Sequence, residues 1–179
     1  MNRRTSILAI VGFGLAARRA AAATAAKPQA ARFWRATIHH TATPPDRPAE
    51  RVRNIDAFHR SLGWDGIGYH LLVAEDGAVF FGRPLTRQGA HAKPENEGNL
   101  GIALIGNYSA APPPAAALAA VRRLLAWAFE TWGFGPDAVW FHKELKATEC
   151  PGAWDKELLL APFRTPDSGL RIERKEAKG

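Results

Sequence analysis

The chain has 179 residues, enough for one domain with a buried core and too few for a second full domain. Its formal net charge is +7, but four of its 24 basic residues lie in the first 25 positions, so the later residues carry 20 basic against 17 acidic side chains, a net charge of +3. A nucleic-acid-binding domain concentrates basic residues in its folded part, so the composition argues against a nucleic-acid partner. The sequence does not indicate an oligomeric state.

Residues 1–26 predict an export signal, and a twin-arginine leader is one route because Arg3 and Arg4 precede the apolar residues 7–17. Small residues through Ala26 offer a cleavage site at residues 23–25. An apolar stretch of 11 residues is too short for a spanning helix, which needs about 20. We therefore expect no stable membrane span once the signal is cleaved, and a periplasmic or extracellular protein. An uncleaved leader and an Ala-rich disordered arm are the alternatives.

The folded part is expected to span residues 32–163. Residues 34–40 alternate apolar and polar positions like a half-buried strand, which places His39 and His40 on opposite faces. A helix ending at Gly63 follows. Its apolar positions recur at helical spacing: Val52, Ile55, Phe58 and Leu62.

Later segments predict a hairpin, a central strand and further helices. Residues 69–74 and 78–83 flank an Asp-Gly turn, residues 84–99 form a long polar loop, and residues 100–106 form a continuous apolar run typical of a buried central strand. After three prolines, a helix carries an apolar face through Trp132, with Arg122 and Arg123 expected to face water.

A short strand at 138–141 leads to His142, and a last helix is expected at about 155–160. Residues 164–179 form a charged tail that we expect to be disordered. The expected fold is mixed α/β (α+β), a single domain with a central mixed sheet flanked by about three helices.

Three candidate metal ligands follow these elements. His39 and His142 each lie at the end of a predicted strand, and Cys150, the single cysteine, follows in a loop before Pro151. Two imidazoles and a thiolate suit Zn²⁺, and three protein ligands leave the fourth position open, as in catalytic zinc sites. Each residue alone is ambiguous, because single histidines and cysteines are common in protein cores.

The local motifs carry a resemblance. Ile38-His39-His40-Thr41-Ala42, Trp64-Asp65-Gly66-Ile67-Gly68-Tyr69-His70 and Thr148-Glu149-Cys150-Pro151-Gly152 together resemble the zinc N-acetylmuramoyl-L-alanine amidases of the peptidoglycan recognition protein and phage amidase type. Gly89-Ala90-His91 and Asn99-Leu100-Gly101-Ile102-Ala103-Leu104 match as well. The resemblance covers residues 32–160, nearly the whole folded part.

The resemblance implies a function and a set of site residues. His39, His142 and Cys150 would bind Zn²⁺, and Tyr69 and Thr148 would line the catalytic pocket. The implied reaction is hydrolysis of the amide that joins the lactyl group of N-acetylmuramic acid to L-alanine, in peptidoglycan or a muropeptide.

Three further residues are candidates for substrate binding. The loop that carries His91 and Asn96 would border the substrate groove, although an ordinary solvated loop is the alternative. Trp64 is a further candidate contact. Trp127, Trp132, Trp140 and Trp154 are expected in the core.

Two other functions stay open from the sequence. The first is a peptidoglycan-binding module that recognises muropeptides without cleaving them, for which loss of the zinc cysteine would be the mark. The second is a metal-free thiol hydrolase in which His142 activates Cys150 as the nucleophile.

Overall fold

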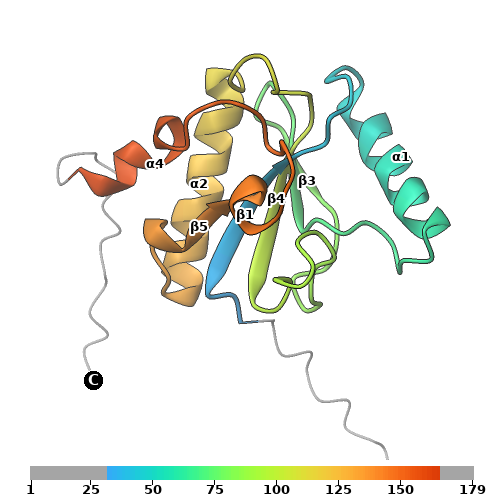
Figure 1. Ribbon diagram of the computed structural model, residues 1–179, viewed down its shortest axis with the longest axis horizontal. Helices are drawn as coiled ribbons and strands as arrows, with labels where there is room; N and C mark the ends of the chain where they lie inside the picture. The colour runs from blue at the N-terminus through green and yellow to red at the C-terminus, as the bar shows by residue number, and fades with distance from the viewer. Residues whose placement is uncertain (1–31, 166–179) are drawn as a thin grey trace, which may run out of the picture.

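The computed structural model describes residues 32–165 (Figure 1), so the predicted export signal and nearly all of the predicted tail lie outside the described residues. A five-stranded sheet with strand order β3-β2-β4-β1-β5 forms its centre. The strands are β1 (Arg35–His40), β2 (Leu71–Val73), β3 (Val79–Phe81), β4 (Asn99–Leu104) and β5 (Val139–Phe141). The helices are α1 (Pro48–Ser61), α2 (Ala115–Trp132), α3 (His142–Leu145) and α4 (Glu157–Arg164), with a 3-10 turn at Pro136–Ala138.

The sheet is mixed. Strand β1 runs parallel to both β4 and β5, β2 runs parallel to β4, and the hairpin partner β3 is antiparallel to β2. The predicted mixed α/β fold, the Asp-Gly hairpin and the buried central strand are therefore confirmed. Three helices of eight or more residues match the expectation, and α3 adds a single turn of four residues.

Strand β1 is buried on both faces, whereas the sequence predicted a half-buried strand. The reason is its place between two parallel neighbours, since parallel strands are covered by helices and connections on both sides. The prediction that His39 and His40 point to opposite faces is confirmed. The His40 ring contacts Tyr108, which belongs to the core beneath α2, while the His39 ring meets Tyr69 on the other side.

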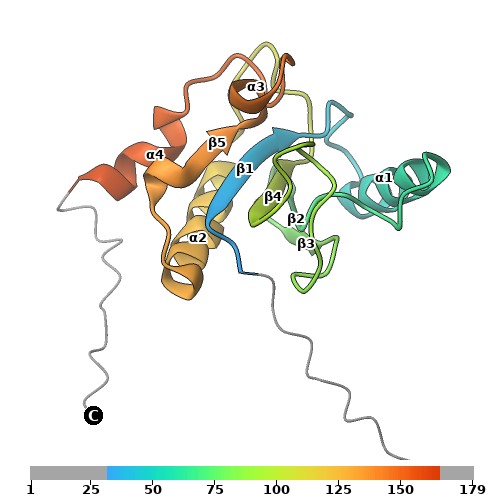
Figure 2. The same ribbon diagram turned by 60° about the horizontal axis from the view of Figure 1, so that its bottom comes forward.

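Two apolar clusters cover the two faces of the sheet. Helix α2 lies against one face of the sheet (Figures 1 and 2). The larger cluster joins α2 and α4 to the sheet and contains Ile38 of β1, Ile102 of β4 and Leu125 of α2. The smaller one joins Val52 and Ile55 of α1 to the other face. Helix α1 lies at the opposite end of the molecule from α4.

Arg122 of α2 is only partly exposed, whereas the sequence predicted that it faces water. Its guanidinium donates hydrogen bonds to the backbone carbonyls of Leu158 and Leu159, which lie near the start of α4. Arg123 is exposed as predicted.

The tryptophans expected in the core divide between buried and exposed positions. Trp154 is buried, and Trp132 is partly buried against the larger cluster. Trp127 and Trp140 are more than a third exposed, because they lie on outer faces of α2 and β5. The core assignment was therefore wrong for these two.

Within residues 32–165, no helix combines the length and apolar character that a membrane crossing requires.

Candidate metal centre and adjoining groove

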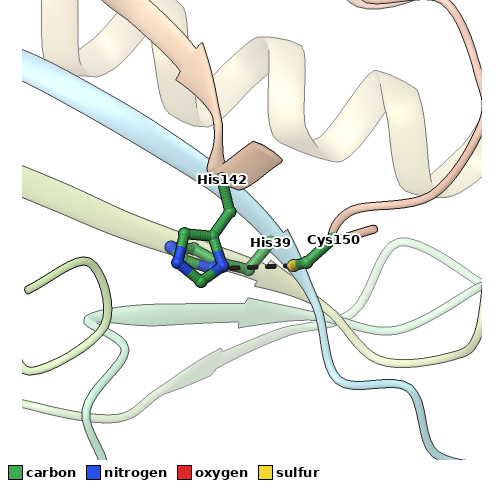
Figure 3. Close-up of side chains that lie close together, drawn as sticks. All are labelled: His39, His142 and Cys150. Atoms are coloured by element: carbon green, nitrogen blue, oxygen red, sulfur yellow. Dashed lines mark hydrogen bonds between the residues drawn. The ribbon is translucent and has the colours of Figure 1, made fainter. Parts of the chain in front are cut away.

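Three side chains from distant parts of the chain meet at the carboxyl ends of the parallel strands. His39 is the penultimate residue of β1, His142 follows β5 directly, and Cys150 lies in the loop after α3. One ligand atom from each residue lies within 4.8 Å of the other two. Figure 3 shows the three side chains pointing toward one another. The carboxyl edge of parallel strands is where open α/β sheets place their binding sites.

The loop that carries Cys150 is tied to the helix that carries His142. The backbone N–H of Lys143 donates to the carbonyl of Cys150 at 2.7 Å, and Nζ of Lys143 donates to the carbonyl of Gly152 at 2.7 Å. Gly152 has a φ of +115°, which L side chains rarely adopt. The glycine after Pro151 therefore lets the loop turn back toward α3.

The sulfur of Cys150 lies at the carboxyl end of β1. It accepts a hydrogen bond from the backbone N–H of His40 at 3.3 Å and lies 3.7 Å from Nδ1 of His39. Burial raises the pKa of the free thiol to about 11, and the His40 N–H offsets part of that effect. A cation that shares this pocket would therefore stabilise the thiolate strongly.

The donor set fits a zinc ion. Tetrahedral Zn²⁺ with usual Zn–N and Zn–S lengths places its nitrogen and sulfur ligands about 3.6 Å apart, close to the separation of 3.7 Å between Nδ1 of His39 and Sγ of Cys150. Burial, followed by the neighbouring histidines 91, 142 and 40, holds the pKa of His39 well below its usual value, and burial also lowers the pKa of His142. Both imidazoles are therefore neutral near pH 7, as ligation requires.

Tyr69 and Thr148 flank the three candidate ligands. The ring of Tyr69 lies 5.1 Å from that of His39, and burial together with the nearby Cys150 raises the pKa of its hydroxyl, which therefore stays protonated. Oγ1 of Thr148 accepts a hydrogen bond from the backbone N–H of Cys150 at 3.3 Å, which leaves the hydroxyl proton free to donate. Both hydroxyls can therefore act as donors beside the centre.

The three residues expected at the substrate differ in their exposure and contacts. His91 is buried, and its Nδ1 lies 3.0 Å from Nε2 of His39. Oδ1 of Asn96 accepts hydrogen bonds from the backbone N–H groups of His91 and Ala92, so Asn96 shapes the loop from within. Trp64 is 39% exposed and packs on the ring of His59 at 4.6 Å.

Sequence reasoning missed the contact between His91 and His39. The predicted loop position suggested solvent or substrate, and only the fold brings residue 91 against β1. Two glycines, Gly89 and Gly101, were the available signal, since each leaves room for the His91 ring.

A groove of about 290 Å³ lies between α1 and Tyr69, and none of the three candidate ligands is among its lining residues. Tyr69 belongs both to this groove and to the surroundings of His39. Its remaining lining residues mix apolar and polar side chains: Thr41, Thr43, Arg51, Asn54, Ile55, Phe58 and His59. A bound chain could therefore lie along α1 with one end at Tyr69, next to His39.

The arrangement matches a known family. The sequence profile described as N-acetylmuramoyl-L-alanine amidase (Amidase_2) matches residues 29–153, which include His39, His142 and Cys150. The chain belongs to this amidase family. The resemblance stated from the sequence is thereby confirmed.

Named relatives of this amidase domain fall into two groups. The N-acetylmuramoyl-L-alanine amidase of Sus scrofa is 42% identical over 152 residues, which are 79% of this chain and 25% of the relative. Peptidoglycan-recognition protein SC2 of Drosophila melanogaster is 36% identical over 123 residues, which are 65% of this chain and 67% of the relative. The chain thus spans about a quarter of the length of the mammalian amidase that it matches.

Solved structures share the fold of this amidase domain. The N-acetylmuramoyl-L-alanine amidase LysC from Clostridium intestinale superposes with a TM-score of 0.68 at 28% identity, over 75% of this chain and 87% of that one. Peptidoglycan recognition protein LE in complex with tracheal cytotoxin, a monomeric peptidoglycan, gives a TM-score of 0.66 at 33% identity, over 73% and 81% of the two chains.

Proposed function

We propose that this chain is a zinc-dependent N-acetylmuramoyl-L-alanine amidase. Its substrate would be peptidoglycan or a muropeptide, and the bond cleaved would be the amide between the lactyl group of N-acetylmuramic acid and L-alanine of the stem peptide. The observation that carries the proposal is the convergence of His39, His142 and Cys150 beside Tyr69, which lines the groove. Membership of the amidase family supports the reaction class.

His39, His142 and Cys150 would hold the ion. Zn²⁺ supplies a Lewis acid that polarises a carbonyl and lowers the pKa of water, so that hydrolysis can proceed near neutral pH. Three protein ligands would leave a fourth position for water or the substrate. Tyr69 lines the groove and has its ring 5.1 Å from that of His39, so we propose that the scissile amide approaches past Tyr69.

Two hydroxyls would stabilise the charge that develops on the substrate. Tyr69 stays protonated because burial raises its pKa, so its O–H can donate to the carbonyl oxygen as it becomes negative. Thr148 is fixed by its contact with the N–H of Cys150, and its own proton can point to the same oxygen. Donors held in place before the reaction lower the barrier because they need no reorganisation.

The groove supports a peptide-containing substrate. Ile55 and Phe58 offer apolar contact area, while Arg51 and Asn54 offer hydrogen-bond donors on the same wall. Solved structures of this fold include complexes with tracheal cytotoxin, a peptidoglycan monomer. We propose that the stem peptide lies along α1.

A binding module without catalysis is the first rival, because several relatives are named peptidoglycan-recognition proteins. The donor set favours the enzyme. A protein that only recognises its ligand has no need of a thiolate and two neutral imidazoles around one point, and here one ligand atom from each of the three residues lies within 4.8 Å of the other two.

A metal-free thiol hydrolase is the second rival. That mechanism requires a thiolate near neutral pH, usually paired with a cationic histidine. Burial instead raises the pKa of Cys150 to about 11 and lowers the pKa of His142. Without a metal ion the thiol is therefore protonated and the imidazole neutral, which opposes this rival.

We also propose export to the periplasm or the cell exterior, where peptidoglycan is found. Support comes from the sequence of residues 1–26, with its arginines, apolar stretch and small residues. The mass of the mature protein recovered from the producing cell tests it. A protein that begins after residue 25 supports cleavage, whereas an intact chain retained in the cytoplasm contradicts it.

Digestion of purified peptidoglycan tests the activity. Mass spectrometry should find free stem peptides with a new L-alanine amino terminus and glycan strands with free lactyl groups. Activity should vanish with a chelator, return with added Zn²⁺ and be absent in Cys150→Ser. Wall binding without release of peptides by the zinc-loaded protein would contradict catalysis, and activity that survives chelation but not alkylation would support the thiol hydrolase.

A further inference from the structure

His91 belongs to the polar loop before β4, but its side chain is buried against β1. Each of its ring nitrogens has one partner. Nδ1 lies 3.0 Å from Nε2 of His39, and Nε2 lies 3.1 Å from the backbone carbonyl oxygen of Asn99. The two histidine rings meet nearly at right angles, at 83°.

These partners fix the proton positions on both rings. A carbonyl oxygen can only accept, so Nε2 of His91 must carry the proton in the contact with Asn99. Nδ1 of neutral His91 then has a lone pair and can only accept. The shared hydrogen bond with His39 therefore requires a proton on Nε2 of His39, which leaves Nδ1 of His39 with its lone pair free.

We propose that His91 is a positioning residue that holds His39 in the tautomer protonated on Nε2 and turns Nδ1 of His39 toward Cys150 and the metal centre. The inference rests on the proposed zinc site. It gives His91 a role through His39, in place of the substrate contact expected from the sequence.

The contact geometry agrees with this role. Nδ1 is the nitrogen of His39 that lies 3.7 Å from Sγ of Cys150, whereas Nε2 faces His91. A histidine ligand donates its other ring N–H to a partner that fixes both the tautomer and the direction of the ring. In most such sites the partner is a carboxylate or a carbonyl, and here a second imidazole relays the contact to a carbonyl.

The residues around His91 hold its ring in this position. A β-carbon at Gly89 or at Gly101 would lie 2.7 Å from Nε2 of His91, so both positions need glycine for the ring to fit between them. Asn96 holds the backbone of the loop at residues 91 and 92. The ring therefore has one place to lie, with its two nitrogens toward His39 and Asn99.

The first arm of the test measures the tautomer directly in the metal-free protein. Long-range ¹⁵N–¹H correlation spectra distinguish a proton on Nδ1 from one on Nε2 in each histidine ring. We expect His39 protonated on Nε2 in the wild type, and a mixed or reversed tautomer in His91→Leu. A wild-type His39 protonated on Nδ1, or an unchanged tautomer in His91→Leu, would overturn the proposal.

The second arm measures the dissociation constant for Zn²⁺. His91→Leu should weaken zinc binding roughly 10–100-fold, the usual loss when the outer partner of a ligand is removed. His91→Asn should restore most of the affinity, because the Asn oxygen reaches the place of Nδ1 and accepts from His39. Val121→Ala, in the core on the other face of the sheet, controls for loss of stability alone and should bind zinc as the wild type does.

The two arms separate this inference from the proposed function. If the wild type binds no zinc, the proposed function fails, and the tautomer measurement still decides the contact between His91 and His39. If the wild type binds zinc, and His91→Leu binds it as tightly as the wild type and His91→Asn do, the positioning role is refuted while the zinc site stands. Should His91→Leu fail to fold, the wild-type tautomer and His91→Asn carry the decision.

Discussion

Gly152 packs against the backbone carbonyl of Tyr108 so closely that a β-carbon at position 152 has no room. Tyr108 follows β4, and its N–H donates to Nδ1 of His40, whose own backbone N–H donates to the sulfur of Cys150. The loop of Cys150, the loop of Tyr108 and the end of β1 are therefore held together around the candidate metal centre. These backbone contacts therefore fix the position of Cys150 beside the end of β1.

Gly152→Ala should damage both the fold and the centre. The positive φ of 115° and the contact with Tyr108 together should cost more than about 2 kcal/mol, because strained backbone alone costs about 1–3 kcal/mol. The midpoint temperature of thermal unfolding should fall by several degrees, and the affinity for Zn²⁺ should drop. Gly135→Ala is the matched control, since its φ is −126° and no other atom lies near its β-carbon position. Equal effects of the two substitutions would refute the argument.

Tyr69→Phe should separate metal binding from turnover. The variant should retain zinc with wild-type affinity, because the phenol is not among the proposed ligands, while kcat should fall roughly 100-fold through loss of one oxyanion donor. The chain has only two tyrosines, which makes Tyr108→Phe a natural control. Tyr108 donates to the carbonyl of Ile105 at 2.9 Å in the core beneath α2, so this variant should lose stability without losing kcat. A Tyr69→Phe enzyme of normal kcat would remove Tyr69 from the mechanism.

Arg122→Met should loosen the attachment of α4 to α2. Its guanidinium donates to the carbonyls of Leu158 and Leu159, and since the side chain is partly exposed we expect a loss of about 1 kcal/mol in the free energy of unfolding. Denaturant unfolding measures the loss. Arg123→Met, one residue along and exposed, should change the unfolding free energy little. Indistinguishable midpoints for the two variants would contradict the contact.

Zinc binding should release about one proton between pH 7 and pH 9. The metal-free thiol of Cys150 has a pKa raised to about 11 by burial, so it is protonated over this range and must lose its proton to bind zinc. His39 and His142 have lowered pKa values and are already neutral there, so they release none. The logarithm of the affinity should therefore rise by about one per pH unit.

Calorimetry in buffers of different ionisation enthalpy counts the protons released. A value near zero over this pH range would mean that Cys150 is not a ligand or is already a thiolate in the free protein. The affinity should fall further in acid, where the imidazoles of His39 and His142 begin to bind protons.

Local patterns were sufficient to predict the elements that carry the ligands. Alternation along residues 34–40 predicted the strand and the opposite directions of His39 and His40, because a strand has a period of two residues. The same pattern could not predict that β1 is buried on both faces. That depends on β4 and β5 pairing on either side, which residues 34–40 do not encode.

Long-range packing accounts for the failures. Arg122 looked solvent-exposed because only the α2 periodicity was visible, and its partners belong to a helix 36 residues further on. The burial of the His91 side chain was missed because its contacts, His39 and Asn99, belong to two strands that the fold brings against it. In both cases the side chain satisfies a polar group that a pattern within one element cannot reveal.

The zinc content of the purified protein, measured by mass spectrometry of the metal after dialysis against a weak chelator, tests the central claim most directly. The wild type should hold one zinc ion per chain, and Cys150→Ser and His142→Ala should each lose nearly all of it while staying folded. A wild type without zinc, or variants that keep a full complement, would contradict a metal centre made of His39, His142 and Cys150.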